Sequence, residues 1–499
     1  MSVLSAYLSK QGENAQTETV AYLAQLEMVA RVDPEIARSI VAELKDQRSR
    51  LKMIASENYS SLSTQLAMGN LMTDKYAEGF PHHRFYAGCD NVDAIEAKAV
   101  DAAKALFGAD HAYVQAHSGA DANMLAFSAI LSKQVQEPAL EKLGVTDPSK
   151  LSNEDWAKVR AELGNQKMIG LNYYSGGHLT HGYRHNISAR MFECLSYDVE
   201  PETEVLDYDK LRALVLKEKP LIFLAGYSAY PRKINFRILR EIADEAGSVF
   251  MVDMAHFAGL VAGKVFTGDF DPVAHADMVT STTHKTLRGP RGGLVLCKEE
   301  YAEWVDKGCP LVLGGPLPHV MAAKAIAFQE ANSDEFKDYA QRIVDNAHAL
   351  AEGLMGAGIR LTSGGTDNHL LVADITSMGL TGRQAESSLR EANITLNRNS
   401  IPFDPNGAWY TSGLRFGTPA LTTLGMGVEE MKEIASIISL VLSNTKANTI
   451  DSGPNAGKQS KAKYSLDAGA LEEAKKRVAA LLERFVLYPE LDHEVLSQI

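Results

Sequence analysis

The sequence predicts an α/β fold, in which a large domain built on a mostly parallel sheet is followed by a smaller α+β domain. Residues 221–225 and 249–252 are continuous apolar runs, and residues 236–246 between them have helical periodicity and end at Gly247. Strands buried on both faces have this composition, and a helix between two of them indicates a parallel βαβ unit. After residue 320 this alternation gives way to longer amphipathic segments. The smaller domain is expected to begin there.

The first 90 residues precede this alternation. Residues 1–31 have a mixed composition, and the first organised helix is predicted after Asp33, which can cap it, with Pro34 at its first position. One face of that helix is expected to carry Ile36, Ile40, Val41 and Leu44. Residues 56–90 are rich in aromatic residues and glycines without a clear period, which predicts an ordered loop region.

A strand, a tight turn and a helix are predicted next. The pattern indicates a helix at 94–107, a strand at 111–115, a turn at 117–119 and a helix at 121–133. Such an arrangement points the N-terminus of a helix at an anion. Residues 134–165 are expected to form a charged helical insertion on the surface.

The C-terminal part is expected to contain four helices, at 336–354, 383–391, 428–442 and 470–485. A strand is predicted near 370–373 and a loop at 397–413. Residues 443–464 are polar and poor in apolar side chains, which predicts a flexible excursion.

Composition excludes several classes of protein. Sixty-three acidic and fifty basic residues give a net charge of −13 without a basic cluster, so nucleic acid is not an expected partner. No apolar stretch approaches the length of a membrane span, and the N-terminus does not resemble a signal peptide. The four cysteines form no C-x-x-C pair. A cytoplasmic protein without a metal is expected.

Lys285 is a candidate nucleophile. It lies between apolar residues 278–279 and 294–296, with His284, Arg288 and Arg291 nearby in the sequence. Desolvation and neighbouring cations lower the pKa of a lysine, and the neutral amine forms Schiff bases with aldehydes. A structural or surface lysine is the alternative interpretation, and the flanking glycines and strands favour the nucleophile.

Asp253 follows the apolar run 249–252 directly and needs a cation or a strong donor if it is buried. The protonated ring nitrogen of pyridoxal phosphate would be such a partner. A carboxylate that caps the next turn is an equally good interpretation. His256 could bond to the ring or to Asp253, although a core histidine is the commoner case.

Three further stretches carry candidate groups. Ser118, Gly119 and Ala120 begin a helix and offer backbone N–H groups to a phosphate, although Asp121 in the first turn opposes an anion. In SGGHLTHG (175–182) two histidines suggest a metal, but a ring stacked by His178 explains the glycines more economically. Arg415 offers a planar fork to a carboxylate; pairing with an internal acid is the alternative.

Taken together, these motifs resemble the serine hydroxymethyltransferase family of pyridoxal-phosphate enzymes, which have the aspartate-aminotransferase fold. The resemblance is carried, in family order, by IASENY (54–59), KYAEGFPHHRFY (75–86), HSG (117–119), SGGHLTHG (175–182), YSAYPR (227–232), DMAHFAGL (253–260), TTHKTLRGPRGG (282–293), LNRNSIPFD (396–404) and TSGLRFGTPA (411–420). It implies a seven-stranded, mostly parallel sheet in a cofactor-binding domain at 91–325. An N-terminal arm and active-site loop would occupy 1–90, and the small domain 326–499.

The resemblance also implies a reaction and its participants. L-serine and tetrahydrofolate would be converted reversibly to glycine and 5,10-methylenetetrahydrofolate, with pyridoxal 5'-phosphate as cofactor and an external aldimine as intermediate. The enzyme would be a homodimer with shared active sites, or a tetramer of such dimers. A folate-independent pyridoxal-phosphate aldolase or racemase is the alternative function.

The resemblance assigns roles by position. The catalytic group would comprise Lys285, Glu78, His178, Thr282, Thr283, His284 and Tyr86. The cofactor would be bound by Ser118, Gly119, Ala120, His178, Ser228, Asp253, His256, Lys285 and Gly315. The substrate carboxylate would be bound by Arg415, with Ser56 and Tyr86 beside it. Folate would contact Glu78, Tyr173, Gly177, His178, Leu179, Asn399, Gly407, Ala408 and Trp409. Tyr76, Glu78, Tyr86 and Gly315 would reach the neighbouring subunit's site.

Three stretches depart from the family pattern. Family members usually have S-G-S-Q where this chain has Ser118 to Asp121, so one phosphate hydroxyl is lost and an acid is gained. CPLVLGGPLPH (309–319) lacks the usual F-P-G-x-Q ahead of its glycine pair, and HGYRHNIS (181–188) is unusually basic.

Overall fold

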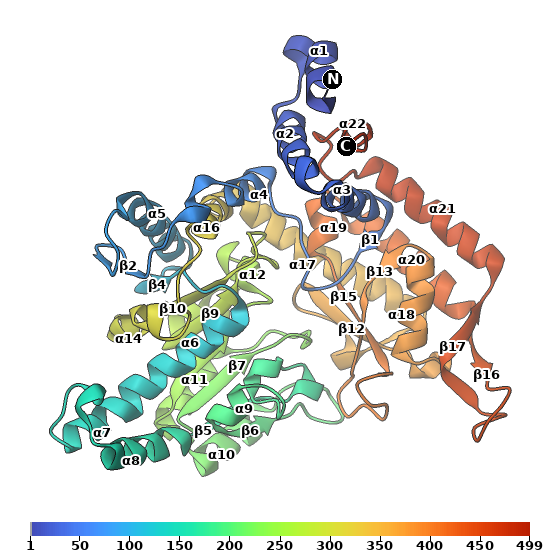
Figure 1. Ribbon diagram of the computed structural model, residues 1–499. Helices are drawn as coiled ribbons and strands as arrows, with labels where there is room; N and C mark the ends of the chain where they lie inside the picture. Colours follow the sequence, from blue (N-terminus) through green and yellow to red (C-terminus); the bar gives the residue numbers. More distant parts are fainter. Residues whose placement is uncertain (1) are drawn as a thin grey trace.

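The computed structural model describes residues 2–499, which form a large domain, a small domain beside it and a helical arm (Figure 1). The arm consists of α1 (Val3–Gln11) and α2 (Thr17–Val32), which lie close to the last helix, α22 (His493–Leu496). Thr19 on α2 donates a hydrogen bond of 2.8 Å to the carbonyl of Glu490. The two ends of the chain therefore stabilise each other.

A seven-stranded sheet forms the centre of the large domain. Its strands lie in the order β4 (His111–Tyr113), β10 (Gly293–Cys297), β9 (Met278–Thr282), β8 (Val249–Asp253), β7 (Ile222–Gly226), β5 (Lys167–Leu171) and β6 (Glu193–Tyr197). β10 runs antiparallel to β4 and β9, while the pairs from β9 to β6 are parallel. The predicted mostly parallel sheet is confirmed.

Helices cover both faces of this sheet. Between β7 and β8 the chain forms α11 (Phe236–Ala246), which ends at Gly247 with φ 70°, as the apolar pattern predicted. Successive strand residues belong to opposite cores: Phe223 packs into the core that contains α11, and Leu224 into the core that contains α6 (Gly119–Leu131). The remaining helices of this domain are α5 (Asp90–Phe107), α7 (Glu137–Lys142), α8 (Asn153–Gly164), α9 (Ser188–Met191), α10 (Tyr208–Glu218), α12 (Ala258–Ala262), α13 (Pro272–His275), α14 (Ala302–Asp306), α15 (Gly308–Leu311) and α16 (Pro318–Ala331).

The small domain is α+β, as predicted. Its sheet has the order β11 (Arg360–Leu361), β12 (Leu370–Asp374), β15 (Gly413–Gly417) and β14 (Asn397–Asn399). Its helices are α17 (Asp334–Gly356), α18 (Gly382–Glu391), α19 (Pro419–Thr423), α20 (Val428–Ser443) and α21 (Ala468–Arg484). β1 (Leu51–Lys52) pairs with β13 (Ile394–Thr395) and attaches the N-terminal segment to this domain.

The N-terminal region differs from the prediction in two ways. Residues 1–31 were expected to lack organised structure, yet α1 and α2 occupy most of their described part. The helix after Asp33 is confirmed as α3 (Pro34–Ser49), and the Asp33 carboxylate accepts a hydrogen bond of 2.9 Å from the Glu35 N–H. Its apolar face is only partly buried: Val41 is buried, whereas Ile36 and Ile40 are 53% and 48% exposed. Periodicity identifies such a face but not what covers it.

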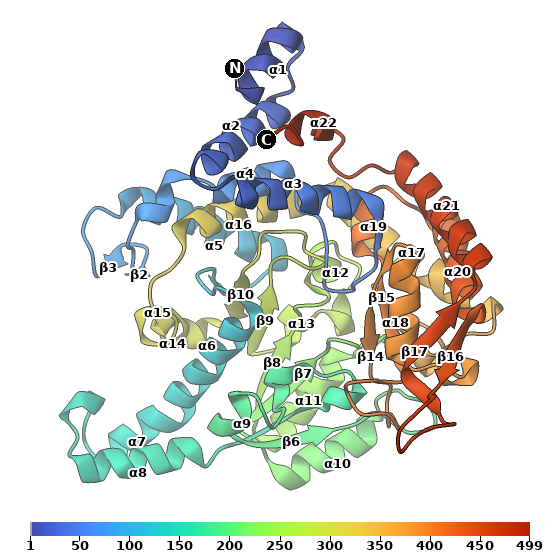
Figure 2. The same ribbon diagram turned by 45° about the vertical axis from the view of Figure 1, so that its right-hand side comes forward.

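Three segments expected to be irregular contain regular structure, and one of them, the predicted loop 397–413, includes β14. Residues 56–90 include α4 (Leu62–Met68) and a short hairpin of β2 (Gly79–Phe80) and β3 (His83–Arg84). The segment 443–464, expected to be a flexible excursion, contributes to a hairpin of β16 (Thr445–Thr449) and β17 (Gln459–Leu466), visible beside α18 in Figure 2. Alternate β17 residues are half-buried and exposed, so a polar hairpin with one contacting face escaped the composition argument.

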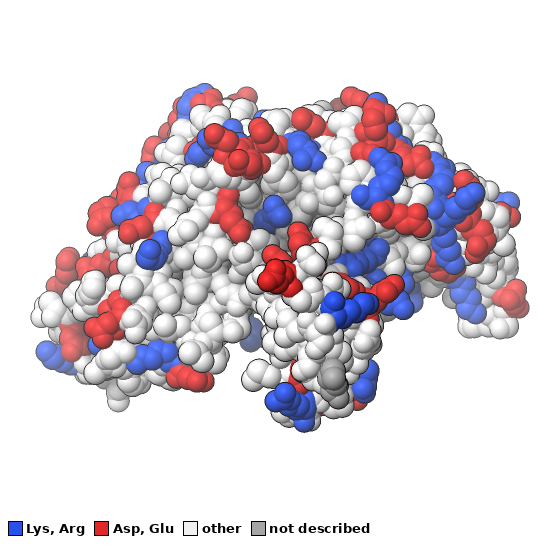
Figure 3. Space-filling view, turned by 90° about the horizontal axis from the view of Figure 1, so that it is seen from above, with Lys and Arg blue, Asp and Glu red and all other residues white. Residues whose placement is uncertain are grey.

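The surface carries charges of both signs. In Figure 3 acidic and basic side chains are interspersed around a broad uncharged area. Within residues 2–499 no helix has both the length and the apolar character needed to cross a membrane. The insertion 134–165 projects from the large domain as α7 and α8, as expected for a surface decoration (Figure 2).

Candidate active site

A cavity of about 720 Å³ lies where the two domains meet, at the carboxyl ends of the central strands. Ligands bind at this edge in open α/β sheets, because the loops that follow parallel strands gather there. Asp253 ends β8, Ser228 follows β7 and Lys285 follows β9. These three residues therefore lie at the same edge of the sheet.

Twelve of the predicted site residues line this cavity. They are Ser56, Tyr173, Gly177, His178, Leu179, Ser228, His256, His284, Lys285, Asn399, Ala408 and Arg415. Gly407 and Trp409 flank Ala408 in the chain, and Trp409 is 63% exposed. Residues of two domains and of the N-terminal segment thus form one site.

Asp253 is an ionised carboxylate beneath the cavity. Its Oδ2 accepts hydrogen bonds from Asn123 Nδ2 at 2.9 Å and His181 Nε2 at 3.2 Å, and its Oδ1 accepts one from the Ala255 N–H at 3.0 Å. Burial opposes its ionisation, but the hydrogen bond and charge of His181 outweigh burial and hold the pKa of Asp253 well below its usual value. Asp253 is therefore suited to pair with a cationic ring nitrogen.

His178 is held as a neutral ring. Burial lowers its pKa to about 4, although the charge of Asp253 acts in the opposite direction. Its Nδ1 lies 2.7 Å from the hydroxyl of Thr180 and 3.2 Å from the Thr180 N–H. A fixed, uncharged imidazole can stack on a flat aromatic ring, as predicted for a cofactor. His178, His181 and Asp253 also present ligand atoms within 4.8 Å of one another, although the sequence offers no metal motif there.

Lys285 is the most reactive amine of the cavity. Burial lowers its pKa from 10.5 to about 8; Asp253 opposes this shift, while Arg415 and Arg291 add to it. The segment around it is anchored by backbone contacts: Asn58 donates to the Lys285 carbonyl at 2.9 Å, and Thr283 donates to the Pro290 carbonyl at 2.6 Å. A free amine is thus available close to neutral pH.

Arg415 is a half-buried arginine without a carboxylate partner among residues 2–499. Its Nε donates to Asn397 Oδ1 at 3.1 Å and its Nη1 to the Ser228 carbonyl at 2.6 Å. Burial lowers its pKa to about 10, and Tyr173 is the group that raises it. The alternative of an internal acid partner for Arg415 is therefore wrong. The fork is oriented by neutral acceptors and remains available to an external carboxylate.

His256 lies at the back of the site. Its Nδ1 is 3.2 Å from Nε2 of His369, and the two rings stack with centroids 5.4 Å apart. Burial, followed by the charge of Lys285, lowers the pKa of His256 well below its usual value. His256 is thus a neutral ring next to the lysine.

The predicted phosphate site at Ser118, Gly119 and Ala120, which we call the anion cradle, is partly occupied by hydrogen bonds within the chain. Ser118 caps α6: its hydroxyl accepts from the Asp121 N–H at 3.1 Å and donates to Asp121 Oδ2 at 2.9 Å. A Cβ at Gly119 would lie 2.7 Å from a methyl carbon of Thr282, so the cradle touches the strand that leads to Lys285. Ser118 to Ala120 do not line the cavity itself.

Four residues that were predicted to reach the neighbouring subunit's site lie away from the cavity of their own chain. Tyr76, Glu78, Tyr86 and Gly315 do not line the cavity. Instead the Tyr76 and Tyr86 rings contact each other with centroids 5.0 Å apart, and a Cβ at Gly315 would lie 3.7 Å from the Tyr76 ring. Tyr76 and Tyr86 are 59% and 46% exposed. One chain therefore does not bring these four residues to its own Lys285.

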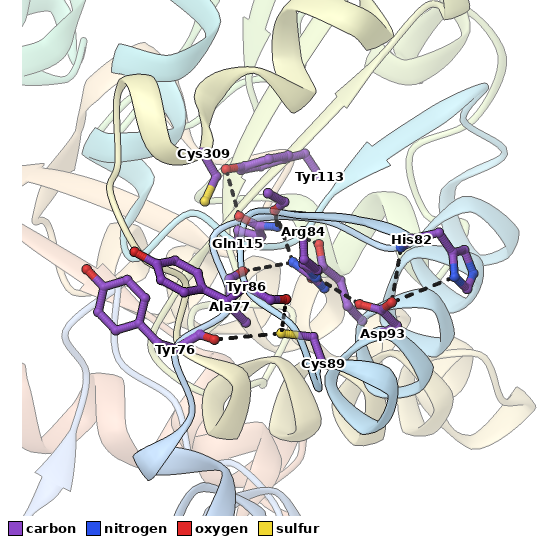
Figure 4. A network of polar contacts seen from close by, with 12 residues as sticks. Tyr76, Ala77, His82, Arg84, Tyr86, Cys89, Asp93, Tyr113, Gln115 and Cys309 are labelled. Atoms are coloured by element: carbon purple, nitrogen blue, oxygen red, sulfur yellow. Dashed lines mark hydrogen bonds and ion pairs between the residues drawn. The ribbon is translucent and has the colours of Figure 1, made fainter.

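A buried ionic network fixes the segment that carries Glu78 (Figure 4). Arg84 Nη1 donates to the carbonyls of Ala77 and Gly79, at 2.9 and 3.0 Å, on either side of Glu78. Arg84 also pairs with Asp93 and Glu96, and its side chain and that of Glu96 are each 3% exposed. The backbone on both sides of Glu78 is therefore held in place by Arg84.

Sequence reasoning missed several residues of the cavity. They are Glu57, Ala229, Arg291, Glu386, Asn397, Arg398, Ser400 and Thr411. Glu57, Arg291 and Asn397 stand inside the quoted motifs, so a complete reading of each motif could have found them. Glu386 lies on α18 outside any motif, where it pairs with Arg398, and only the fold brings it to the site.

This fold, with a half-buried lysine and an ionised carboxylate at neighbouring strand ends, defines the pyridoxal-phosphate-dependent enzymes of fold type I. The family model described as serine hydroxymethyltransferase matches residues 29–147 and 157–438. The chain belongs to the serine hydroxymethyltransferase family.

Curated relatives of that name cover nearly the whole chain. The chain is 61% identical to serine hydroxymethyltransferase of Treponema pallidum (strain Nichols) over 497 residues, which are 99% of this chain and 86% of that protein. It is 58% identical to that of Salinispora tropica over 480 residues, 96% and 99% of the two chains. For Chlamydia trachomatis serovar D the identity is 53% over 498 residues, 99% of each chain.

The lowered pKa of Lys285 predicts its reactivity in the cofactor-free protein. Because only the neutral amine reacts, its acetylation by trace acetic anhydride should rise with pH and level off with a midpoint near pH 8. Mass spectrometry of the Lys285 peptide measures this rate. Asp253→Asn removes a charge that raises the pKa, so it should move the midpoint to lower pH. A midpoint near 10.5 in the unaltered chain would contradict the account of burial.

Proposed function

We propose that the chain converts L-serine and tetrahydrofolate reversibly to glycine and 5,10-methylenetetrahydrofolate, with Lys285 at the reacting centre. The observation that carries the proposal is Arg415, a half-buried fork with no carboxylate partner in residues 2–499, in the same cavity as Lys285. An α-amino acid bound by its carboxylate at Arg415 would present its amine toward Lys285. Membership of the family supports this substrate.

The residues beneath the cavity fit pyridoxal phosphate. Asp253 is ionised and buried, which suits a protonated pyridine nitrogen, and the neutral ring of His178 suits its face. When bound, this cofactor supplies an electron sink for charge that develops at the Cα of the amino acid. Ser228 and His256 would contact the phenolic oxygen side of the ring, and Gly119 and Ala120 would offer N–H groups to the phosphate.

Each remaining group of the chain has a distinct task in this proposal. Lys285 holds the cofactor and accepts or returns a proton at Nζ, for which a pKa of about 8 is suitable. Arg415 would fix the carboxylate and thereby the orientation of the amino acid in the cavity. Thr282, Thr283 and His284 keep the lysine segment in place, and Ser56 lies beside the substrate.

The folate site is proposed at the mouth of the cavity. Tyr173 and Leu179 are 36% and 42% exposed there and offer apolar surface to a flat ring. Gly177, Asn399 and the loop from Gly407 to Trp409 would complete the site. Trp409 already lies under the guanidinium of Arg383, at 5.3 Å, which holds the indole in place.

A homodimer with shared sites is part of the proposal, and two dimers forming a tetramer are compatible with it. Glu78 and Tyr86, with Tyr76 and Gly315, form a partly exposed surface away from their own Lys285. In a dimer Glu78 would act in proton transfer at the serine hydroxyl bound by the partner. We place the enzyme in the cytoplasm, which the four free cysteines support.

The folate requirement tests the proposed reaction. Glycine formation from serine should rise strongly when tetrahydrofolate is added to the holoenzyme, because the one-carbon unit then has an acceptor. Product analysis by chromatography measures the rate. Glycine formation that does not change with tetrahydrofolate would indicate a folate-independent aldolase or racemase and would contradict the proposal.

Loss of the Arg415 fork should mainly weaken binding of the amino acid. Arg415→Ala removes a hydrogen-bonded ion pair of about 1.5–3 kcal/mol, so the KM for serine should rise roughly 10- to 100-fold. Arg398→Ala is the matched control, since Arg398 lines the same cavity but is already paired with Glu386. An unchanged serine affinity in Arg415→Ala would show that the carboxylate is bound elsewhere.

Shared sites predict complementation between inactive subunits. A heterodimer of Lys285→Arg and Glu78→Gln chains, purified through two tags, should show about half of the activity of the unaltered dimer, because one of its two sites is intact. A heterodimer of an unaltered chain and a chain with both changes should be inactive. If Glu78 acted in its own chain's site, the two results would be reversed.

A further inference from the structure

Lys324 is a fully buried lysine outside the site described above. It lies on α16, and 1% of its surface is exposed. Its ammonium donates three hydrogen bonds, to the carbonyls of Val114 at 2.6 Å, Ala116 at 2.9 Å and Gly293 at 2.8 Å. All three donors are thus used, and every acceptor is a backbone carbonyl.

These three carbonyls belong to the two segments that flank the anion cradle. Val114 and Ala116 lie between β4 and the turn at Ser118, and Gly293 is the first residue of β10, where the loop that carries Lys285 returns to the sheet. The Gly293 N–H also donates to the Ala116 carbonyl at 2.8 Å. Lys324 therefore connects residues 114–116, which lead into the anion cradle, to Gly293, where the loop that carries Lys285 ends.

The packing around this junction leaves no room for larger residues. A Cβ at Gly292 would lie 2.5 Å from Lys324 Cε, and one at Gly293 would lie 2.2 Å from the Ser118 carbonyl oxygen. The glycine pair that ends the lysine loop is therefore what allows the ammonium to reach its three acceptors. The same end of β4 is held on its other side by Gln115, whose amide donates to Gly79 and Glu96 (Figure 4).

A lysine at this position is costly if packing is its sole purpose. Burying an ammonium that no carboxylate pairs with costs several kcal/mol, and an apolar side chain of similar volume would avoid that cost. Burial lowers the pKa of Lys324 to about 7, and Glu96 is the one charge that raises it. The presence of a lysine despite this cost indicates that its hydrogen-bond donors or its charge are needed where the two segments meet.

The cradle itself shows what that requirement is. The Ser118 hydroxyl is occupied by Asp121, which also places a carboxylate at the start of α6. An anion at Ser118 to Ala120 therefore meets a negative charge and finds no free hydroxyl there. The backbone N–H groups of the cradle therefore remain for the anion, and Lys324 fixes this backbone through the Ala116 carbonyl, two residues before Ser118.

We propose that Lys324 is a positioning residue for the phosphate of the cofactor, because its three hydrogen bonds set the backbone of the cradle against the Lys285 segment. The proposal rests on the function proposed above and deepens it. It assigns recognition of the phosphate group to a residue that does not touch the phosphate.

The experiment compares two aldehydes that differ only in the phosphate. Apo-protein is titrated with pyridoxal phosphate and with pyridoxal, and both Kd values are measured from absorbance. Lys324→Met should raise the Kd for pyridoxal phosphate about tenfold or more, the loss expected for a charged interaction, and change that for pyridoxal less than about twofold. Met321→Leu, a buried change on the same helix, should leave both values as they are.

The ratio of the two Kd values separates a positioning role from a structural one. If Lys324→Met raised both Kd values equally, or neither, the proposal would be overturned, whereas the proposed cofactor would stand. If Lys324→Met fails to fold by circular dichroism, Lys324→Gln, which keeps a donor without the charge, takes its place with the same expectations. Failure of both variants to fold would overturn the proposal in favour of a role in the fold alone. An unaltered protein that binds neither aldehyde would overturn the cofactor assignment and this inference together.

Discussion

The rest of the site depends on the negative charge of Asp253 and on the hydrogen bonds that keep this carboxylate ionised. A carboxylate at the end of a buried strand stays ionised only because His181, Asn123 and the Ala255 N–H bind it. That charge raises the pKa values of Lys285 and of His178, and without it burial would lower both further. The strand order β9, β8, β7, β5 brings Lys285, which follows β9, Asp253, which ends β8, and His178, which follows β5, to one edge of the sheet.

The predicted site residues fall into two sets: one lies at the cavity of the chain, and the other lies on a loop away from that cavity. Lys285 and Arg415 line one cavity with Asp253 beneath it, whereas Glu78 lies on a loop that Arg84 holds against α5 (Figure 4). The end of β4 serves both parts: Gln115 binds the Glu78 loop, and the neighbouring carbonyls bind Lys324 beneath the cradle. A displacement of this strand end would therefore affect both the chain's own site and the surface presented to a partner.

Sequence reasoning predicted the parts of the fold in which local pattern and burial agree. The run 249–252, Gly247 and the helix between β7 and β8 were predicted almost to the residue, because strands buried on both faces must be apolar throughout. It failed where structure depends on distant contacts. The arm α1 and α2 packs on the chain's C-terminus, and the hairpin β16–β17 is polar with one contacting face, so neither has a strong local signal. Motifs located Lys285 and Arg415, but Glu386 reaches the cavity only through the packing of α18.

The central claim is that Lys285 holds the cofactor. Borohydride reduction of the holoenzyme followed by peptide mass spectrometry tests it most directly. The account predicts a reduced pyridoxyl phosphate adduct on the peptide that contains Lys285, and its loss in Lys285→Arg with the fold retained. An adduct on another lysine, or none in a protein that is active with serine and tetrahydrofolate, would contradict it.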